Sequence, residues 1–263
     1  MTRREQPPFV ALTIAVIAVT VVAAPLVGLV WRAPWSAVGD VLGDAAVRTA
    51  LRVSLVVSLG ASVVALALGL PLAWVLARVD FPGRRLIRAV ALVPLVLPPV
   101  VGGVALLLAF GRRGLLGQWL DDWFGVRLPF TTAGAVLAGA FVAMPFVVVS
   151  AEAAFRNLDR RYEEAARTLG ASRWTVFRRV TVPLTAPALA AAAALAWARA
   201  LGEFGATITF AGNTPGRTST VPIQVYLLLE SGRLESAVVL SLVLLVVSIV
   251  ILVGLRDRWL KVV

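Results

Sequence analysis

Six apolar stretches without a charged residue constrain this chain more than any other feature of its sequence. A helix needs roughly 20 mostly apolar residues to cross the hydrocarbon core of a bilayer. Because backbone groups in lipid must be hydrogen-bonded within the protein, long continuous stretches of this kind predict helices. We therefore expect an all-α integral membrane protein with about six transmembrane helices, at Phe9–Val30, Val53–Ala77, Ala89–Gly111, Leu128–Ala151, Val180–Ala198 and Ser236–Leu255.

Composition excludes a water-soluble globule. Hydrophobic residues make up 60% of the 263 residues and charged residues 15%, whereas soluble domains have about 45–50% and about 25%. The first stretch resembles a signal peptide, because Arg3 and Arg4 precede it. Its apolar part is longer than the roughly 7–15 residues of a signal sequence, so we expect a retained span. The whole chain, residues 1–263, is then a single transmembrane domain.

Missing residue types limit the chemistry that the chain can perform. It contains no cysteine and no histidine, and its only lysine is Lys261. The phosphate-binding loop GxxxxGK[ST] is therefore absent, and so is the commonest acid/base group. We expect no enzyme activity, no metal site and no cofactor in this chain.

The distribution of arginines predicts the orientation, because basic residues concentrate in cytoplasmic loops. Six spans place both termini on the same side. That side collects the seven arginines between Arg156 and Arg179 and those at both ends of the chain, and it holds twice as many basic residues as the other. We expect a multi-pass protein of the cytoplasmic (inner) membrane with both termini in the cytoplasm. The net charge of +11 then indicates contact with anionic membrane lipid rather than nucleic acid.

Two features interrupt the apolar pattern of the spans. Pro98-Pro99 is followed by Gly102-Gly103, which is either ordinary tolerance of proline in a membrane helix or a bend that lines a pathway. Arg199 and Glu203 lie four residues apart near the end of the fifth span. An arginine at that depth is expensive unless it is paired or faces water, so the two residues either neutralise each other or belong to a gate.

The segment after the fifth span breaks the pattern again. Gly205–Pro222 contains the turn signal Asn213-Thr214-Pro215-Gly216 and predicts an irregular external or re-entrant segment. Pro222–Leu229 is too short to cross the membrane and predicts an interfacial helix.

Residues 152–180 form the longest polar stretch of the chain. Tyr162–Leu169 predicts a short helix that ends at Gly170, and a second amphipathic helix runs from Trp174 toward Pro183. Two short helices that meet at a glycine form a knob for a groove on a partner protein. The alternative is an amphipathic segment that rests on lipid headgroups through its arginines.

The spacing within this stretch is specific. Glu164-Ala165-Ala166, then Gly170, then Val180-Thr181-Val182-Pro183 resembles the motif EAA-x3-G-x9-I-x-L-P of the permease subunits of binding-protein-dependent ABC importers. The sequence departs from that motif only by valine at the Ile and Leu positions. In that family the loop holds the coupling helix that sits in a cleft of the ATPase subunit. The resemblance therefore implies an ATPase-coupling role for Glu164, Ala165, Ala166, Gly170 and Pro183.

Three further segments resemble the molybdate and sulfate permeases within that family. They are Pro94–Gly102, Gly111–Gly114 with Gly117, and Gly202–Asn213 with Pro215–Thr218, the last being similar to the molybdate branch in particular. The resemblance covers roughly residues 45–255 and implies the type I ABC importer permease architecture. It implies molybdate as the substrate, with tungstate or sulfate as alternatives.

The resemblance also implies partners. Two copies of the permease pair around a central pathway, two cytoplasmic ATPase subunits bind ATP and Mg, and a periplasmic or lipid-anchored binding protein delivers the oxyanion. Within the chain, hydroxyl and amide groups suit an oxyanion, so the pathway or gate residues are predicted to be Pro98, Pro99, Arg199, Glu203, Thr207, Thr209 and Asn213. A self-contained secondary transporter or channel is the alternative from another class; it would leave the basic loop without a role.

Overall fold

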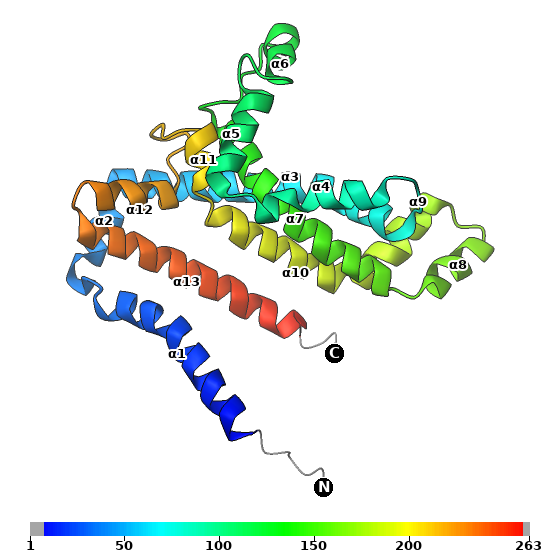
Figure 1. The fold of residues 1–263 in the computed structure, drawn as a ribbon, viewed down its shortest axis with the longest axis horizontal. Coiled ribbons are helices and arrows are strands. Elements are labelled where there is room, and N and C mark those ends of the chain that lie inside the picture. The colour runs from blue at the N-terminus through cyan, green and yellow to red at the C-terminus, as the bar shows by residue number, and fades with distance from the viewer. Residues whose placement is uncertain (1–7, 260–263) are drawn as a thin grey trace.

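The computed structural model describes residues 8–259, which form helices joined by turns and loops (Figure 1). The longest helices lie side by side in one bundle, and one shorter helix pair leaves the bundle at its middle. In chain order the elements are α1 (Phe9–Trp31), η1 (Trp35–Ala37), α2 (Val38–Gly43), α3 (Ala45–Arg78), α4 (Arg84–Val96), α5 (Pro99–Phe110), α6 (Gly117–Phe124), α7 (Thr132–Asn157), α8 (Arg160–Thr168), α9 (Arg173–Val176), the π-helical turn η2 (Phe177–Thr181), α10 (Val182–Leu201), α11 (Gly205–Phe210), α12 (Val221–Glu230) and α13 (Leu234–Trp259).

The core of the bundle is the contact of α3 with α7 and α10. Its buried residues are mostly small, including Ala61, Ala140 and Ala196. A Cβ atom at Gly139 would lie only 2.9 Å from the Cβ of Ala61. Small residues at such contacts let helix backbones approach closely, which is how helices gain packing energy where lipid supplies no hydrophobic driving force.

Five helical segments of the described range are long and apolar enough to cross a membrane: Phe9–Trp31, Ala45–Arg78, Thr132–Asn157, Arg173–Leu201 and Leu234–Ile251. They match five of the six expected spans. The remaining one, Ala89–Gly111, is not one continuous helix, because α4 ends at Val96 and α5 begins at Pro99. Arg3, Arg4 and Lys261, which entered the orientation argument, lie outside the described residues.

The break between α4 and α5 follows from Pro98-Pro99. Leu97 has an extended backbone (φ −68°, ψ 128°), as expected for a residue before proline. Pro99 then starts α5 at its first turn, where the missing N–H costs nothing. The bend predicted as one of two alternatives is therefore present, and α5 turns away from the bundle toward α6 (Figure 1).

The distal end of this arm is held by ion pairs. Asp121 of α6 accepts hydrogen bonds from Nε of Arg127 (2.9 Å) and Nε of Arg112 (3.1 Å). The bond from Arg127 is the main cause that lowers the pKa of Asp121 below its ordinary value. The two arginines therefore close the loops on both sides of α6 around one carboxylate.

The expected irregular segment after the fifth span contains a short helix, α11, which packs against α5. A Cβ atom at Gly205 would lie 2.8 Å from the Cβ of Pro99, and one at Gly103 would lie 2.6 Å from the Cβ of Thr209. This close approach requires glycine at both positions. The short helix predicted at Pro222–Leu229 is confirmed as α12, which packs against α13 and α3.

Helix α1 differs from the other long helices because none of its membrane-length window is buried. It touches α13 near one end and then diverges from the bundle (Figure 1). Its apolar side chains, such as Phe9 and Val19, remain largely exposed. They require cover from lipid or from another chain.

Candidate functional site

The predicted coupling segment consists of two short helices, as expected. Asp159 caps α8 by accepting a hydrogen bond from the backbone N–H of Arg161 (2.9 Å). At the other end Gly170 has φ +85°, its N–H donates to the carbonyl of Arg167, and the N–H of Ala171 donates to the carbonyl of Ala166. These two bonds with a left-handed glycine are a Schellman motif, which fixes the sharp end of α8.

The second short helix is continuous with the next span. Ser172 caps α9 through the N–H of Thr175 (3.2 Å), and the π-helical turn η2 connects α9 directly to α10 through Pro183. Proline at the first turn of α10 does not interrupt this connection. The helices α9, η2 and α10 therefore form one continuous helical rod with a π-bulge, a feature often found at functional sites.

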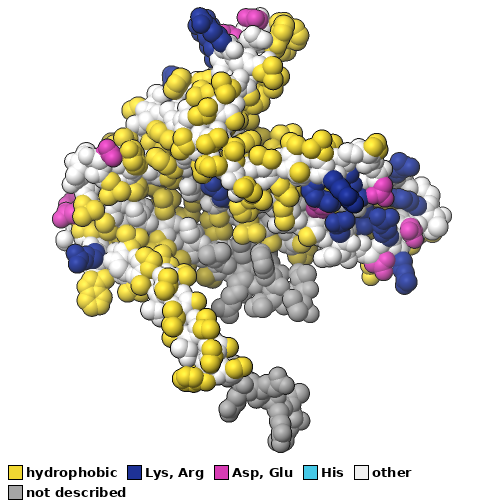
Figure 2. Space-filling view, in the orientation of Figure 1, with side chains coloured by type: hydrophobic (Ala, Val, Ile, Leu, Met, Phe, Trp, Pro, Cys, Tyr) yellow, Lys and Arg dark blue, Asp and Glu magenta, His cyan; other side chains and the backbone are white. Residues whose placement is uncertain are grey.

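The coupling residues differ in exposure. Glu164, Ala165 and Gly170 are exposed, and Ala166 is half-buried. Leu169 is 88% exposed although it is apolar, and Trp174 is 68% exposed. The end of the molecule formed by α8 and α9 (Figure 1) thus presents an open surface with both polar and apolar groups, and Lys and Arg side chains gather toward this end in the space-filling view (Figure 2).

Glu163, the residue before the motif, was not singled out by the sequence analysis. It is only 5% exposed. Its Oε1 accepts hydrogen bonds from Nη2 of Arg78 (3.2 Å) and from the hydroxyl of Thr181 (2.7 Å), and the same Arg78 donates to the carbonyl of Leu158 (3.2 Å). This buried network fastens α8 to the end of α3 and to η2. The sequence offered one signal for Glu163: it lies three residues before Ala166, and therefore on the same face of the predicted helix as that small apolar residue.

A second buried carboxylate lies one helix away. Glu152 of α7 is 7% exposed and pairs with Arg88 of α4, whose Nε lies 3.1 Å from Oε2. Arg156, one turn further along α7, lies 3.6 Å from the same carboxylate. The pair joins the first part of the divided span to α7 at the end of the bundle that carries α8.

The predicted pair of Arg199 and Glu203 is confirmed, with 2.7 Å between Nη1 and Oε2. The helix continues past the expected end of the span at Ala198 and stops at Leu201, before Glu203. Glu203 lies in the following turn, where its Oε1 also accepts the backbone N–H of Ala206 (2.9 Å). Glu203 is therefore buried at 3% exposure and joins the end of α10 to the start of α11.

The other predicted pathway residues separate into two groups. Pro99 contacts the start of α11 at Gly205, Thr207 is buried within α11, and the Thr209 hydroxyl donates to the carbonyl of Gly205 (2.8 Å). Pro98 is exposed at the break, and Asn213 is exposed in the turn after α11. The structure thus assembles Pro99, Glu203, Thr207 and Thr209 at the contact of α5 with α11, whereas Asn213 lies in the loop beyond.

These features coincide with a family match over most of the chain. Residues 69–262 match the family described as the binding-protein-dependent transport system inner membrane component. The chain belongs to this family, and it is accordingly a multi-pass inner membrane protein that forms part of a transporter.

Similar proteins of known function narrow the group. The chain is 43% identical over 244 residues to the molybdenum transport system permease protein ModB of Mycobacterium tuberculosis, covering 93% of this chain and 92% of the relative. It is 47% identical over 183 residues to ModB of Escherichia coli, covering 68% and 80%. It is 38% identical over 186 residues to the sulfate transport system permease protein CysT of Escherichia coli, covering 71% and 67%.

Solved structures agree on the fold. One similar structure is that of a bacterial alginate ABC transporter in complex with an alginate-pentasaccharide-bound periplasmic protein. A chain of that structure superposes on this one with a TM-score of 0.72 at 17% sequence identity, and the match covers 96% of this chain and 93% of that one. A chain of the inward-facing MetNI methionine ABC transporter superposes with a TM-score of 0.60 at 18% identity, covering 81% and 94%. The fold class expected from the sequence is confirmed.

Adjacent glutamates provide a test of the buried network. We expect Glu163→Gln to lower the free energy of unfolding by roughly 3 kcal/mol, because it leaves the buried Arg78 without its charge partner. The matched control is Glu164→Gln, an exposed position where the change should stay within about 0.5 kcal/mol. Chemical unfolding of the full-length protein in detergent measures both. Equal losses for the two variants would show that the network does not hold α8.

Proposed function

We propose that this chain is the permease subunit of an ABC importer that moves molybdate across the inner membrane. The observation that carries the proposal is the 43% identity to a molybdenum permease over 93% of the chain, together with an exposed EAA segment at one end of the bundle. Sulfate is the second candidate, since a sulfate permease is 38% identical; tungstate, as an oxyanion of the same shape, is the third.

The energy for transport comes from separate subunits in this proposal. The chain has no phosphate-binding loop motif, and it performs no bond chemistry. Two ATPase subunits bind ATP and Mg, and each receives one α8–α9 knob with Glu164, Ala165, Ala166 and Gly170 at the contact. If the chain were instead a self-contained secondary transporter, the alternative from another class of protein, the exposed pair of helices α8 and α9 would have no role.

The contacts of the knob suggest how its movement reaches the pathway. Glu163 joins α8 to α3 and η2, and η2 continues through Pro183 into α10. At the far end of α10, Arg199 and Glu203 connect to α11, which packs on α5 beside Pro99. We infer that a movement of α8 turns α10 and shifts α11 against the break between α4 and α5, so that Pro98, Pro99, Thr207, Thr209 and Asn213 border the oxyanion pathway.

A second copy of the chain completes the pathway in this proposal. The apolar surface of α1 is uncovered, and α5 leaves the bundle with Val100, Val104 and Leu108 exposed. Both surfaces suit a partner helix. A periplasmic or lipid-anchored binding protein then delivers the oxyanion to the side opposite α8.

Transport by the reconstituted complex tests the substrate. We expect ATP-dependent uptake of molybdate into proteoliposomes that contain the permease, its ATPase and its binding protein, with excess sulfate competing weakly. Labelled molybdate measures the uptake, and vesicles without the ATPase are the control. Equal competition by sulfate would assign the chain to sulfate, and uptake without the ATPase would support a secondary transporter.

Two glycines with the same left-handed backbone conformation test the coupling role. Gly170 and Gly232 have φ +85° and +73°, and a Cβ atom at either meets nothing within 4 Å. Proline fixes φ near −65° and is incompatible with both. We expect Gly170→Pro, like Glu164→Lys, to reduce substrate-stimulated ATP hydrolysis to its basal rate while membrane insertion stays intact. The control Gly232→Pro, at the other end of the bundle (Figure 1), should keep most of the stimulation; equal loss would contradict docking at α8.

Reporter fusions test the orientation. A reporter that is active only in the cytoplasm should be active when fused after Arg160, because the arginine-rich end faces inward. Fused after Gly117 or Gly216, it should be silent. Activity at Gly216 would reverse the orientation.

The contact of Glu203 with α11 tests the gate. We expect the double variant Arg199→Ala/Glu203→Leu to assemble with the ATPase but to hydrolyse ATP without the loaded binding protein, because α11 loses both its ion pair and its N-terminal hydrogen bond. Glu203→Gln is the milder comparison, since its amide oxygen can still accept the N–H of Ala206. Uptake and ATP hydrolysis are measured together. If uptake and the stimulation of ATP hydrolysis by the loaded binding protein stay normal in the double variant, Arg199 and Glu203 have no gating role.

A further inference from the structure

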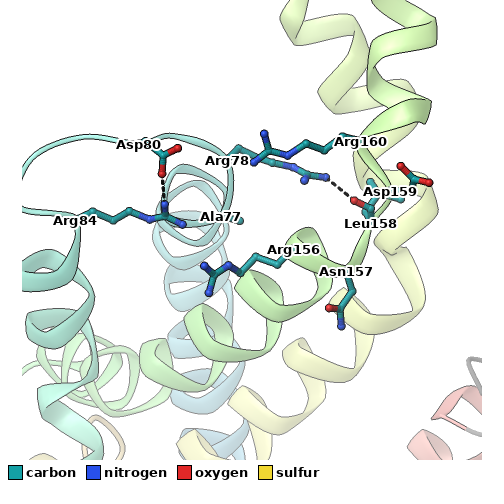
Figure 3. A pocket seen from close by; sticks show the side chains of 9 residues that line it. All are labelled: Ala77, Arg78, Asp80, Arg84, Arg156, Asn157, Leu158, Asp159 and Arg160. Carbon is teal, nitrogen blue, oxygen red and sulfur yellow. Dashed lines mark hydrogen bonds and ion pairs between the residues drawn. The ribbon is translucent and has the colours of Figure 1, made fainter.

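A cavity lined by arginines lies beside the coupling segment, at the end of the bundle where α3 and α7 finish (Figure 3). Its volume is about 620 Å³, within the roughly 300–1,000 Å³ of small-molecule pockets. Neither the coupling contact nor the predicted pathway uses it. Its lining is contributed by the end of α3, the loop before α4, the first residue of α4, the end of α7, the turn after it and the start of α8: Ala77, Arg78, Asp80, Arg84, Arg156, Asn157, Leu158, Asp159 and Arg160.

Positive charge predominates around the cavity. The guanidinium groups of Arg84 and Arg156 approach the space from one side and those of Arg78 and Arg160 from the other, while Asp159 points outward (Figure 3). Asp80 pairs with Arg84. Among the side chains that the structure describes, Arg160 has no acidic partner within ion-pair distance, and Arg156 lies 3.6 Å from Glu152, which Arg88 already binds. The cavity therefore has more positive than negative groups available to a ligand.

Two buried donors around the cavity have no acceptor. The Nε atoms of Arg78 and Arg84 make no hydrogen bond, although the side chain of Arg78 is only 8% exposed. An unsatisfied buried donor costs about 1–3 kcal/mol, more when it is charged. These two N–H groups have almost no accessible surface, so a ligand in the cavity meets the exposed guanidinium groups of Arg156 and Arg160. A phosphate group suits such guanidinium forks geometrically.

An apolar groove on α4 points to the source of that phosphate. The groove has a volume of about 380 Å³ and is lined by Ala89, Leu92, Val93, Val96, Leu97 and Pro98. Ala89, Leu92 and Val96 follow Arg85 at helical spacing. Arg85 does not line the cavity itself. It forms a neighbouring recess with Asp80 and Arg84, which do line the cavity, so this recess adjoins the cavity on the face of α4 that carries the groove. From Arg84 to Val96 the helix rises about 18 Å, which is close to one leaflet of a hydrocarbon core about 30 Å thick.

We propose that the arginine cavity binds the phosphate group of an anionic phospholipid whose acyl chain lies in the groove of α4. Basic pockets between membrane helices at the cytoplasmic surface are suited to such headgroups. The bound lipid would bridge α3, α4, α7 and α8, and so stabilise the joint from which the coupling helix emerges. This site does not depend on which oxyanion is transported.

Native mass spectrometry tests the proposal. The sample is the full-length permease assembled with its ATPase and extracted from vesicles of phosphatidylcholine with added phosphatidylglycerol. We expect retention of phosphatidylglycerol but not of phosphatidylcholine. Arg156→Gln/Arg160→Gln should weaken retention roughly tenfold or more. Both side chains are outside the buried Glu163 network, so the variant should fold, and size-exclusion profiles check this.

The charge-matched control is Arg161→Gln/Arg167→Gln on the exposed side of α8, which should retain the lipid as the wild type does. Inorganic phosphate and glycerol phosphate form a separate arm, and neither should displace the lipid at equal concentration. Equal retention by the cavity variant and its control, or retention of phosphatidylcholine as well, would overturn the site. Displacement by inorganic phosphate would overturn the lipid assignment and show a site for a free anion.

Discussion

The buried carboxylate of Glu163 holds α8 to the membrane bundle. It accepts hydrogen bonds from Arg78 of α3 and from Thr181 of η2, and burial makes both bonds expensive to break. Without them α8 would be attached only by its two ends. With them, the exposed face that carries Glu164 and Gly170 is fixed relative to two different spans.

Close packing and polar contacts also connect this end of the bundle to the opposite end. Small residues such as Ala61 and Gly139 let α3 and α7 pack closely. The rod of α9, η2 and α10 connects one end to Arg199 and Glu203 at the other. Glu203 then shares its carboxylate between an ion pair and the start of α11, and in the proposed mechanism this contact connects the coupling end to the break at Pro98-Pro99. The proposed lipid site would reinforce the joint where this path begins.

Much of the fold and part of the candidate site could be predicted from the sequence, because the signals that determine them are local. Apolar stretches predicted five of the observed long helices, and Gly170 predicted the end of α8. The four-residue spacing predicted the pairing of Arg199 with Glu203, although not the end of α10 before it. The EAA spacing identified the family that the comparison confirmed.

Contacts between distant segments were decided only by the tertiary structure. Arg78 and Glu163 are far apart in the chain, as are Arg88 and Glu152, and no local pattern indicates which charges will be buried together. Pro98-Pro99 left open whether proline is merely tolerated there or makes a bend that lines a pathway; the structure shows the break between α4 and α5 and the packing of Gly205 against Pro99 beside it. Hydrophobic length and backbone hydrogen bonding determine that a segment becomes a membrane helix, whereas the partner of each polar group is determined by which helices pack around it.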